Sequence, residues 1–209
     1  MPKEPGIYPL QQIVFHNPPV AEVPEPRLPT ISGSAVVGAS SMVIGDVRVD
    51  EDVTILFHNV IRADSAAPFY IGPRTNIQDF VLIHVHPGHS LTVNGERFGV
   101  YIEGDVSILH HAAPHGPLYV GRNTFIGQHV SIYGAMIGRN CVLMHGSVVA
   151  NHVRIADNRF VAPGQAVYTQ AQADALPEVP PSLKGLNAEI VDFYFRLGRS
   201  YKMHTPLVL

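Results

Sequence analysis

The chain has 209 residues, of which 46% are hydrophobic and only 15% are charged, and its net charge at pH 7 is −3. This composition supplies enough apolar surface for a packed core, which excludes a wholly disordered chain. The small negative charge provides no basic field for nucleic acid or an anionic membrane, and no apolar run is long enough for a spanning helix. We therefore expect a protein that binds neither nucleic acid nor membrane.

Residues 1–30 are rich in proline and are predicted to form an extended N-terminal arm. The first ten residues lack the apolar stretch of a signal peptide, so we expect a cytoplasmic protein. The single cysteine, Cys141, excludes a disulfide framework within the chain.

Residues 31–170 follow a period of six. Starting at Ile31 and allowing two insertions and one shortened step, every sixth residue is Ile, Val or Leu, except Pro114. Small or branched side chains recur four residues after these positions, and Cys141 falls in that set as a buried filler. This period fits neither an alternating strand nor a helix. It predicts an all-β domain of short parallel strands joined by tight corners, in about seven triangular coils of three hexads each.

Residues 171–209 are predicted to form a C-terminal helical segment. We expect a short helical turn over 171–176 and a longer helix to about Tyr201, with Ser182 as its N-cap. One apolar stripe of this helix should pack against the flank of the β domain, and it consists of Leu183, Leu186, Ile190, Phe193 and Leu197.

The hexad pattern resembles that of the hexapeptide-repeat family. The resemblance implies a left-handed parallel β-helix, usually trimeric; the handedness comes from the family, because β crossovers are right-handed as a general rule. Acyltransferases, carbonic anhydrases and binding proteins share this fold, so the repeat alone does not define a function.

The period also locates polar side chains. With the two insertions left out, Arg62, His84 and His115 are three hexads apart and should stack on one face at a rung spacing of about 4.8 Å. Two imidazoles on adjacent rungs can converge on a metal ion, at about 2.0–2.1 Å per Zn–N bond. His110 lies two residues after Ile108, which is one hexad before Pro114, hence on a different face. A single chain could not easily bring it to the pair, so we expect a site shared between subunits. The alternative is a pair of stacked surface imidazoles that bind no metal.

Several motifs around these residues resemble the γ-class carbonic anhydrases. They are Arg62-Ala63-Asp64, Asn76-Ile77-Gln78-Asp79, His84, the segment from His110 to His115-Gly116-Pro117, and the run from Gln170 to Pro177. The resemblance implies a homotrimer in which His84 and His115 of one subunit and His110 of its neighbour hold Zn²⁺, or Fe²⁺ or Co²⁺.

The same resemblance assigns roles to the neighbouring polar residues. Asn76 and Gln78 match residues that orient the bound water or bicarbonate. Arg62 and Asp64 match an ion pair at the trimer interface, for which a purely structural role is an equal alternative, and Asp79 matches a supporting acid.

The activity implied is the reversible hydration of CO₂ to bicarbonate and a proton by a metal-bound hydroxide. In the family's fast members an acidic loop after the first metal histidine exports the proton. Here that loop, over residues 85–101, has Glu96 as its only acid, and it resembles the subgroup without the acidic insertion. His86 and His89 are possible proton carriers, since the usual pKa of histidine is about 6.5; the alternative is that both are solvated loop residues.

Two other functions compete with this one. A CoA-dependent hexapeptide acyltransferase would need one histidine as a base and not three that converge, which counts against it. A catalytically weak or inactive metal-binding homologue with a structural or assembly role is favoured by the missing acidic loop.

Overall fold

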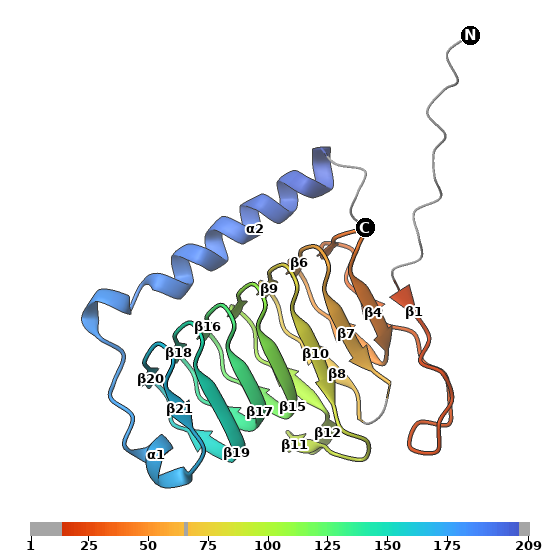
Figure 1. The fold of residues 1–209 in the computed structure, drawn as a ribbon. Helices are drawn as coiled ribbons and strands as arrows, with labels where there is room; N and C mark the ends of the chain where they lie inside the picture. Colours follow the sequence, from red (N-terminus) through yellow and green to blue (C-terminus); the bar gives the residue numbers. More distant parts are fainter. Residues whose placement is uncertain (1–13, 65–66, 205–209) are drawn as a thin grey trace.

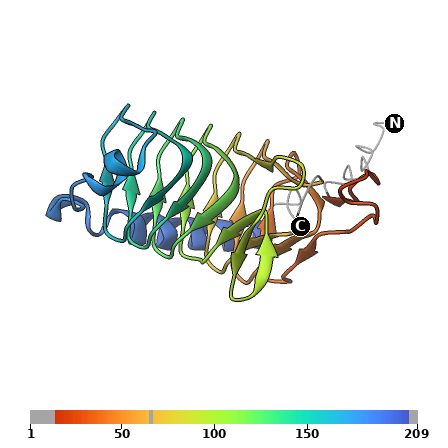
Figure 2. The same cartoon turned by 90° about the horizontal axis from the view of Figure 1, so that it is seen from below.

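The computed structural model describes residues 14–64 and 67–204. They form a left-handed parallel β-helix of triangular cross-section, with a long helix along its flank (Figure 1). The view from below shows the coils stacked one behind another along a single axis (Figure 2). The predicted fold class is confirmed.

Each coil contributes strands to three faces. The first face contains β1 (Val14–Phe15), β4 (Met42–Gly45), β7 (Val60–Ala63), β10 (Leu82–Val85), the first halves of β15 (Ala113–Val120), β17 (Ser131–Ile137) and β19 (Val148–Ile155), and β21 (Ala166–Val167). The second face contains β3 (Val36–Val37), β6 (Thr54–Ile55), β9 (Asn76–Ile77), β14 (Ser107–Ile108), β16 (Phe125–Ile126), β18 (Val142–Leu143) and β20 (Phe160–Val161). The third face contains β2 (Thr30–Ile31), β5 (Val47–Val49), β8 (Phe69–Ile71), β13 (Val100–Ile102) and the second halves of β15, β17 and β19. The second face has seven strands and the first has eight, so the β-helix has about eight turns, against the seven or so coils predicted.

The predicted period matches the packing of the core. The hexad positions from Val37 to Val167 point inward and are buried, including Pro114, and Ile31 is half-buried against them. Cys141 is fully buried, and its burial raises the pKa of the thiol to about 11, so it is an inert filler.

The loop predicted over residues 85–101 contains an antiparallel hairpin, β11 (Leu91–Val93) and β12 (Glu96–Phe98), which lies along one edge of the β-helix (Figure 1). Its two-residue turn, Asn94-Gly95, has φ values of 50° and 86°. Both residues tolerate positive φ, which is why Asn-Gly is common in such hairpins.

Part of the predicted arm belongs to the β-helix. β1 pairs in parallel with β4, and β2 pairs with β5, so the chain between them caps the first coil. The part of the predicted arm that precedes Val14 lies outside the described residues.

The C-terminal segment contains α1 (Gln170–Asp174), capped by Thr169, and α2 (Leu186–His204). Ser182 is not the N-cap of the long helix: it lies in a 3₁₀ turn over Pro181–Leu183, and the first i−4 hydrogen bond of α2 runs from the N–H of Glu189 to the carbonyl of Gly185. Among the described residues, no helix has both the length and the apolar character needed to cross a bilayer.

Leu183, Leu186 and Ile190 of the predicted stripe are half-buried against an apolar cluster that includes Phe125 and Val142. α2 thus covers the second face partly as predicted. Its buried residues are Asn187, Val191 and Gly198, whereas Phe193 is 51% exposed. The amide of Asn187 donates to the carbonyl of Asp105 and to Asn123, and Gly198 lets the helix approach Thr54. Asn187, Val191 and Gly198 take the most buried positions, each one residue after a half-buried leucine or isoleucine, so only Phe193 of the predicted stripe lies outside the contact.

Candidate functional site

The first half of the candidate site lies on the first face. His84 of β10 and His115 of β15 are register partners on adjacent coils, as predicted, and their ring centroids are 5.4 Å apart. Nδ1 of His115 lies 2.9 Å from the carbonyl oxygen of Gly116. A proton on Nδ1 donates to that carbonyl, which leaves the Nε2 lone pair available to a ligand.

Burial lowers the pKa of both imidazoles. For His84 the positive charge of Arg62 adds to this effect, and for His115 the neighbouring His86 and His89 do so. A lowered pKa keeps the rings neutral near pH 7, which is the form that binds metals.

Arg62 and Asp64 belong to the same half. The guanidinium Nη1 of Arg62 contacts Asp64 Oδ2 at 3.0 Å within one chain, because the two side chains lie on the same side of β7 and the residue after it. The other carboxylate oxygen, Oδ1, is buried and lies 3.3 Å from Nε2 of His84. The carboxylate of Asp64 therefore links Arg62 to the imidazole of His84.

The second half lies at the corner between the second and first faces. Nδ1 of His110 lies 3.1 Å from Oδ2 of Asp79 and 3.3 Å from the backbone nitrogen of Asp79. These contacts correspond to two tautomers of the ring. In one of them Nδ1–H donates to the carboxylate and Nε2 is available to a metal. Oδ1 of Asp79 accepts the N–H of Phe57 at 3.0 Å, which fixes the carboxylate.

Asn76 and Gln78 lie beside His110 on the second face and not beside the histidine pair. Both are buried, and their amides form a chain in which Gln78 donates to Asn76 at 3.1 Å and Asn76 donates to Ser107 at 2.8 Å. In one chain the predicted residues therefore form two half-sites on different faces, one around His84 and His115 and the other around His110. Within the described residues, one chain holds no group of three or more histidine, cysteine or acidic side chains that could bind a metal.

The predicted proton carriers differ in their positions. The ring of His86 lies 4.9 Å from that of His115, and the ring of His89 lies 6.0 Å from that of His86; both residues are exposed. Glu96 is not near the histidine pair within one chain, because its carboxylate contacts Arg48 on the third face at 3.4 Å.

One aromatic residue of the first half-site was not among the predicted site residues. Tyr133 stacks on His115, with ring centroids 4.7 Å apart and an interplanar angle of 17°. The signal was present: Tyr133 follows Ile132 as His115 follows Pro114, so it occupies the same column one coil later.

The chain is similar to known proteins over most of its length. It is 34% identical over 201 residues to a carbonic anhydrase of Methanosarcina thermophila, and the match covers 90% of the chain and 81% of that relative. The chain belongs to the γ-class carbonic anhydrase family. No protein-family model matches the sequence.

Two further comparisons extend this result. The chain is 38% identical over 172 residues to the carboxysome assembly protein CcmM of a Nostoc species, covering 82% of the chain but only 31% of that longer protein. Among solved structures, a hexapeptide transferase family protein of Anaplasma phagocytophilum superposes with a TM-score of 0.70, over 90% of the chain and 98% of that protein. Its 19% identity makes this a likeness of fold alone. The chain thus has the fold of hexapeptide-repeat proteins and the sequence of a γ-class carbonic anhydrase.

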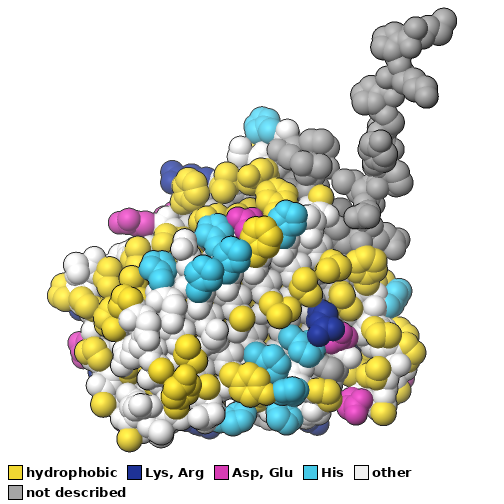
Figure 3. Space-filling model, viewed as in Figure 1, with side chains coloured by type: hydrophobic (Ala, Val, Ile, Leu, Met, Phe, Trp, Pro, Cys, Tyr) yellow, Lys and Arg dark blue, Asp and Glu magenta, His cyan; other side chains and the backbone are white. Residues whose placement is uncertain are grey.

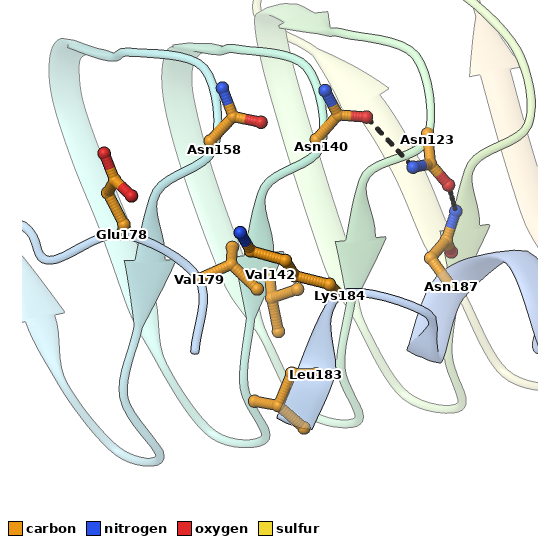
Figure 4. Close-up of a pocket in the computed structure, with 9 residues that line it drawn as sticks. All are labelled: Asn123, Asn140, Val142, Asn158, Glu178, Val179, Leu183, Lys184 and Asn187. Atoms are coloured by element: carbon orange, nitrogen blue, oxygen red, sulfur yellow. Dashed lines mark hydrogen bonds between the residues drawn. The ribbon is translucent and has the colours of Figure 1, made fainter. Parts of the chain in front are cut away.

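A cavity of about 430 Å³ lies apart from both half-sites, between the last coils and the start of α2 (Figure 4). Three of its lining residues, Asn123, Asn140 and Asn158, occupy the same corner of successive coils with φ values of 54–60°. Asparagine tolerates this left-handed conformation, so the corners account for the polar ladder in Figure 4.

Proposed function

We propose that this chain catalyses the reversible hydration of CO₂ to bicarbonate and a proton at a metal site shared between subunits of a homotrimer. The ligands in this proposal are His84 and His115 of one subunit and His110 of its neighbour. The observation that carries it is the in-register pair His84 and His115, with neutral rings and a fixed tautomer at His115.

The division into half-sites supports the shared arrangement. A catalytic site of this type needs three protein ligands and one open position, and one chain presents two of them on the first face and the third at a corner. Exposed apolar side chains surround these positions, as expected of a surface that packs against another subunit. They are Met42, Phe80, Leu82 and Tyr133, with exposed fractions of 41–52%. Figure 3 shows histidine and apolar side chains gathered on this face.

Three neutral imidazoles suit Zn²⁺, and they also accept Fe²⁺ or Co²⁺. When bound, such a cation supplies Lewis acidity that lowers the pKa of coordinated water from about 15.7 toward about 7. The protein's own residues then hold and orient the reactants. Gly116 and Asp79 fix the ligand rings, and Arg62 holds Asp64 beside His84.

The amide chain of Gln78, Asn76 and Ser107 is buried and rigid, so it can present a fixed donor or acceptor to CO₂ or bicarbonate where the half-sites meet. His86 and His89 form an ordered line from His115 to solvent. We assign proton export to this line, with His89 as its outer member.

Mixing two inactive variants tests the proposal. His84→Ala removes one half-site and His110→Ala removes the other, so each homotrimer should lack metal-dependent hydration in stopped-flow assays with Zn²⁺ or Fe²⁺. When the two are unfolded and refolded together, about one quarter of the interfaces should carry all three histidines and regain activity.

The matched control mixes His84→Ala with His115→Ala, which damage the same half-site and should not complement each other. A mixture of His84→Ala and His110→Ala that stays inactive, while refolded parent protein is active, would contradict a site between subunits.

The similarity to CcmM supports a second candidate role, in assembly. Under this alternative the refolded mixture should recover metal binding but no CO₂ hydration. Metal content and hydration measured on the same samples therefore separate the two roles.

A further inference from the structure

A second, smaller cavity lies on the other side of the corner that follows His115. It has a volume of about 190 Å³ and lies between the hairpin strand β11 and the third face of the β-helix. Part of its wall is apolar and is formed by Leu91, Pro117 and Met136. None of its lining residues belongs to either half-site.

The polar part of the wall carries hydrogen-bond donors and no carboxylate. Its polar side chains are those of Ser90, His152 and Arg154. Arg97 stands behind Ser90 and donates Nε and Nη2 to the serine hydroxyl at 3.0 and 2.8 Å. Because the oxygen of Ser90 accepts both bonds, its own proton is available to a ligand.

The guanidinium of Arg154 has no ion pair or hydrogen bond among the described residues, since only its backbone contacts Gln170. Asp174, the acid that also contacts Gln170, accepts the glutamine amide at 2.8 Å and makes no ion pair with Arg154. Glu96 of the hairpin is paired with Arg48. Arg154 is exposed, so the cavity presents an accessible positive charge, without an acidic partner among the described residues, beside an apolar wall.

We propose that this cavity binds a small carboxylate-type oxyanion. The planar guanidinium of Arg154 offers paired donors that match two carboxylate oxygens, and Ser90 offers a third donor. Short organic acids and bicarbonate share this chemistry. The apolar wall favours the organic acids, because a short alkyl chain can be buried against Leu91 and Met136. The proposal depends on neither the metal nor the hydration of CO₂.

Met136 provides a probe inside the cavity. The full-length protein, labelled at its methionine methyl groups, is titrated with propionate, bicarbonate or chloride at constant ionic strength, and methyl NMR spectra are recorded. We expect the Met136 resonance, assigned by its loss in Met136→Leu, to shift with propionate and to saturate in the millimolar range. Bicarbonate should shift it with lower affinity, and chloride should leave it in place.

Arg154→Gln should weaken propionate binding at least about tenfold, which is the usual effect of losing hydrogen bonds to a charged group. Ser90→Ala should weaken it less. Arg199→Gln is the matched control, because this exposed arginine lies on α2 over Phe195. Binding unchanged in both Arg154→Gln and Ser90→Ala, the same shift with chloride, or no shift at all would each overturn the proposal. If bicarbonate binds more tightly than propionate, the alkyl-binding part of the proposal is wrong.

Discussion

The ring of Phe80 lies parallel to the imidazole of His111, with centroids 5.0 Å apart and an interplanar angle of 3°. The stack continues to His58 on one side and to His129 on the other. All four residues occupy the same corner of successive coils, with φ values of 56–62°. Positive φ is strained for a bulky residue such as phenylalanine, and Phe80 is also 52% exposed. Its presence there favours a surface that a second subunit covers.

Phe80→Asp should therefore disrupt the proposed trimer, because it would bury a charge in the subunit interface. Sedimentation velocity at micromolar concentration should show monomers, and metal-dependent hydration should fall with the trimer population. Phe193→Asp, at an equally exposed position on α2, is the control and should remain trimeric. An unchanged trimer in Phe80→Asp would remove this corner from the interface.

Asp79→Asn should reduce metal affinity about 10–100-fold, the usual effect of changing the partner of a ligating histidine. An amide can donate to Nδ1 of His110, which moves the ring proton to Nε2, whereas its oxygen can still accept the N–H of Phe57. Competition with a chromophoric chelator measures the change, and Asp174→Asn is the control. Equal metal affinity in the parent and Asp79→Asn would show that this carboxylate does not select the tautomer.

His89→Ala should lower the kcat of CO₂ hydration about tenfold while leaving kcat/KM unchanged, because export of the proton follows the chemical step. Added imidazole buffer should restore kcat. His204→Ala, which removes an exposed histidine at the end of α2, should have no effect. If His89→Ala lowers kcat/KM as strongly as kcat, the histidine acts on substrate and not on the proton.

Glu103 supports a prediction about stability and pH. Its carboxylate accepts two hydrogen bonds from Arg139, at 2.6 and 2.7 Å, and these lower its pKa from 4.5 to about 2. A lowered acid pKa stabilises the fold above the unfolded-state value, and this stabilisation is lost as the pH falls from 4.5 toward about 2.

Glu103→Gln should therefore lower the thermal midpoint at pH 7, and the difference from the parent should shrink between pH 4.5 and the lowest pH at which the protein stays folded. Glu51→Gln is the control, since this exposed side chain makes no ion pair among the described residues. A Glu103→Gln difference that stays constant over this pH range would mean that packing, and not the charge, is responsible.

The hexad period was sufficient to predict the β-helix and the column of His84 and His115, because each coil places every third hexad on the same face. By the same rule Tyr133 was predictable, and the pair Asn94-Gly95 was a sufficient signal for the hairpin. The contact face of α2 was predictable only in part from apolar spacing. Leu186 and Ile190 pack on the second face as expected, but Asn187 is buried because its amide is hydrogen-bonded, and Gly198 because only glycine leaves room for Thr54.

The arrangement of the two half-sites was predictable only in outline. The period placed His110 on a different face from His115, but it does not show that Asp79 supports His110 or that Asp64 Oδ1 faces His84. Those contacts depend on which way each side chain turns at a corner or a strand end, and hexad spacing does not contain that information.

The parallel register of the coils also determines where this chain can tolerate a change in length. The hairpin of β11 and β12 adds residues at a corner, and the coil after it still pairs Val100 with Phe69. A deletion of one hexad between His84 and His115 would instead rotate the rest of the chain by one face and separate the histidine pair. Insertions at corners therefore leave the register of the coils unchanged. A change in the number of residues along a face would instead move the ligands out of alignment.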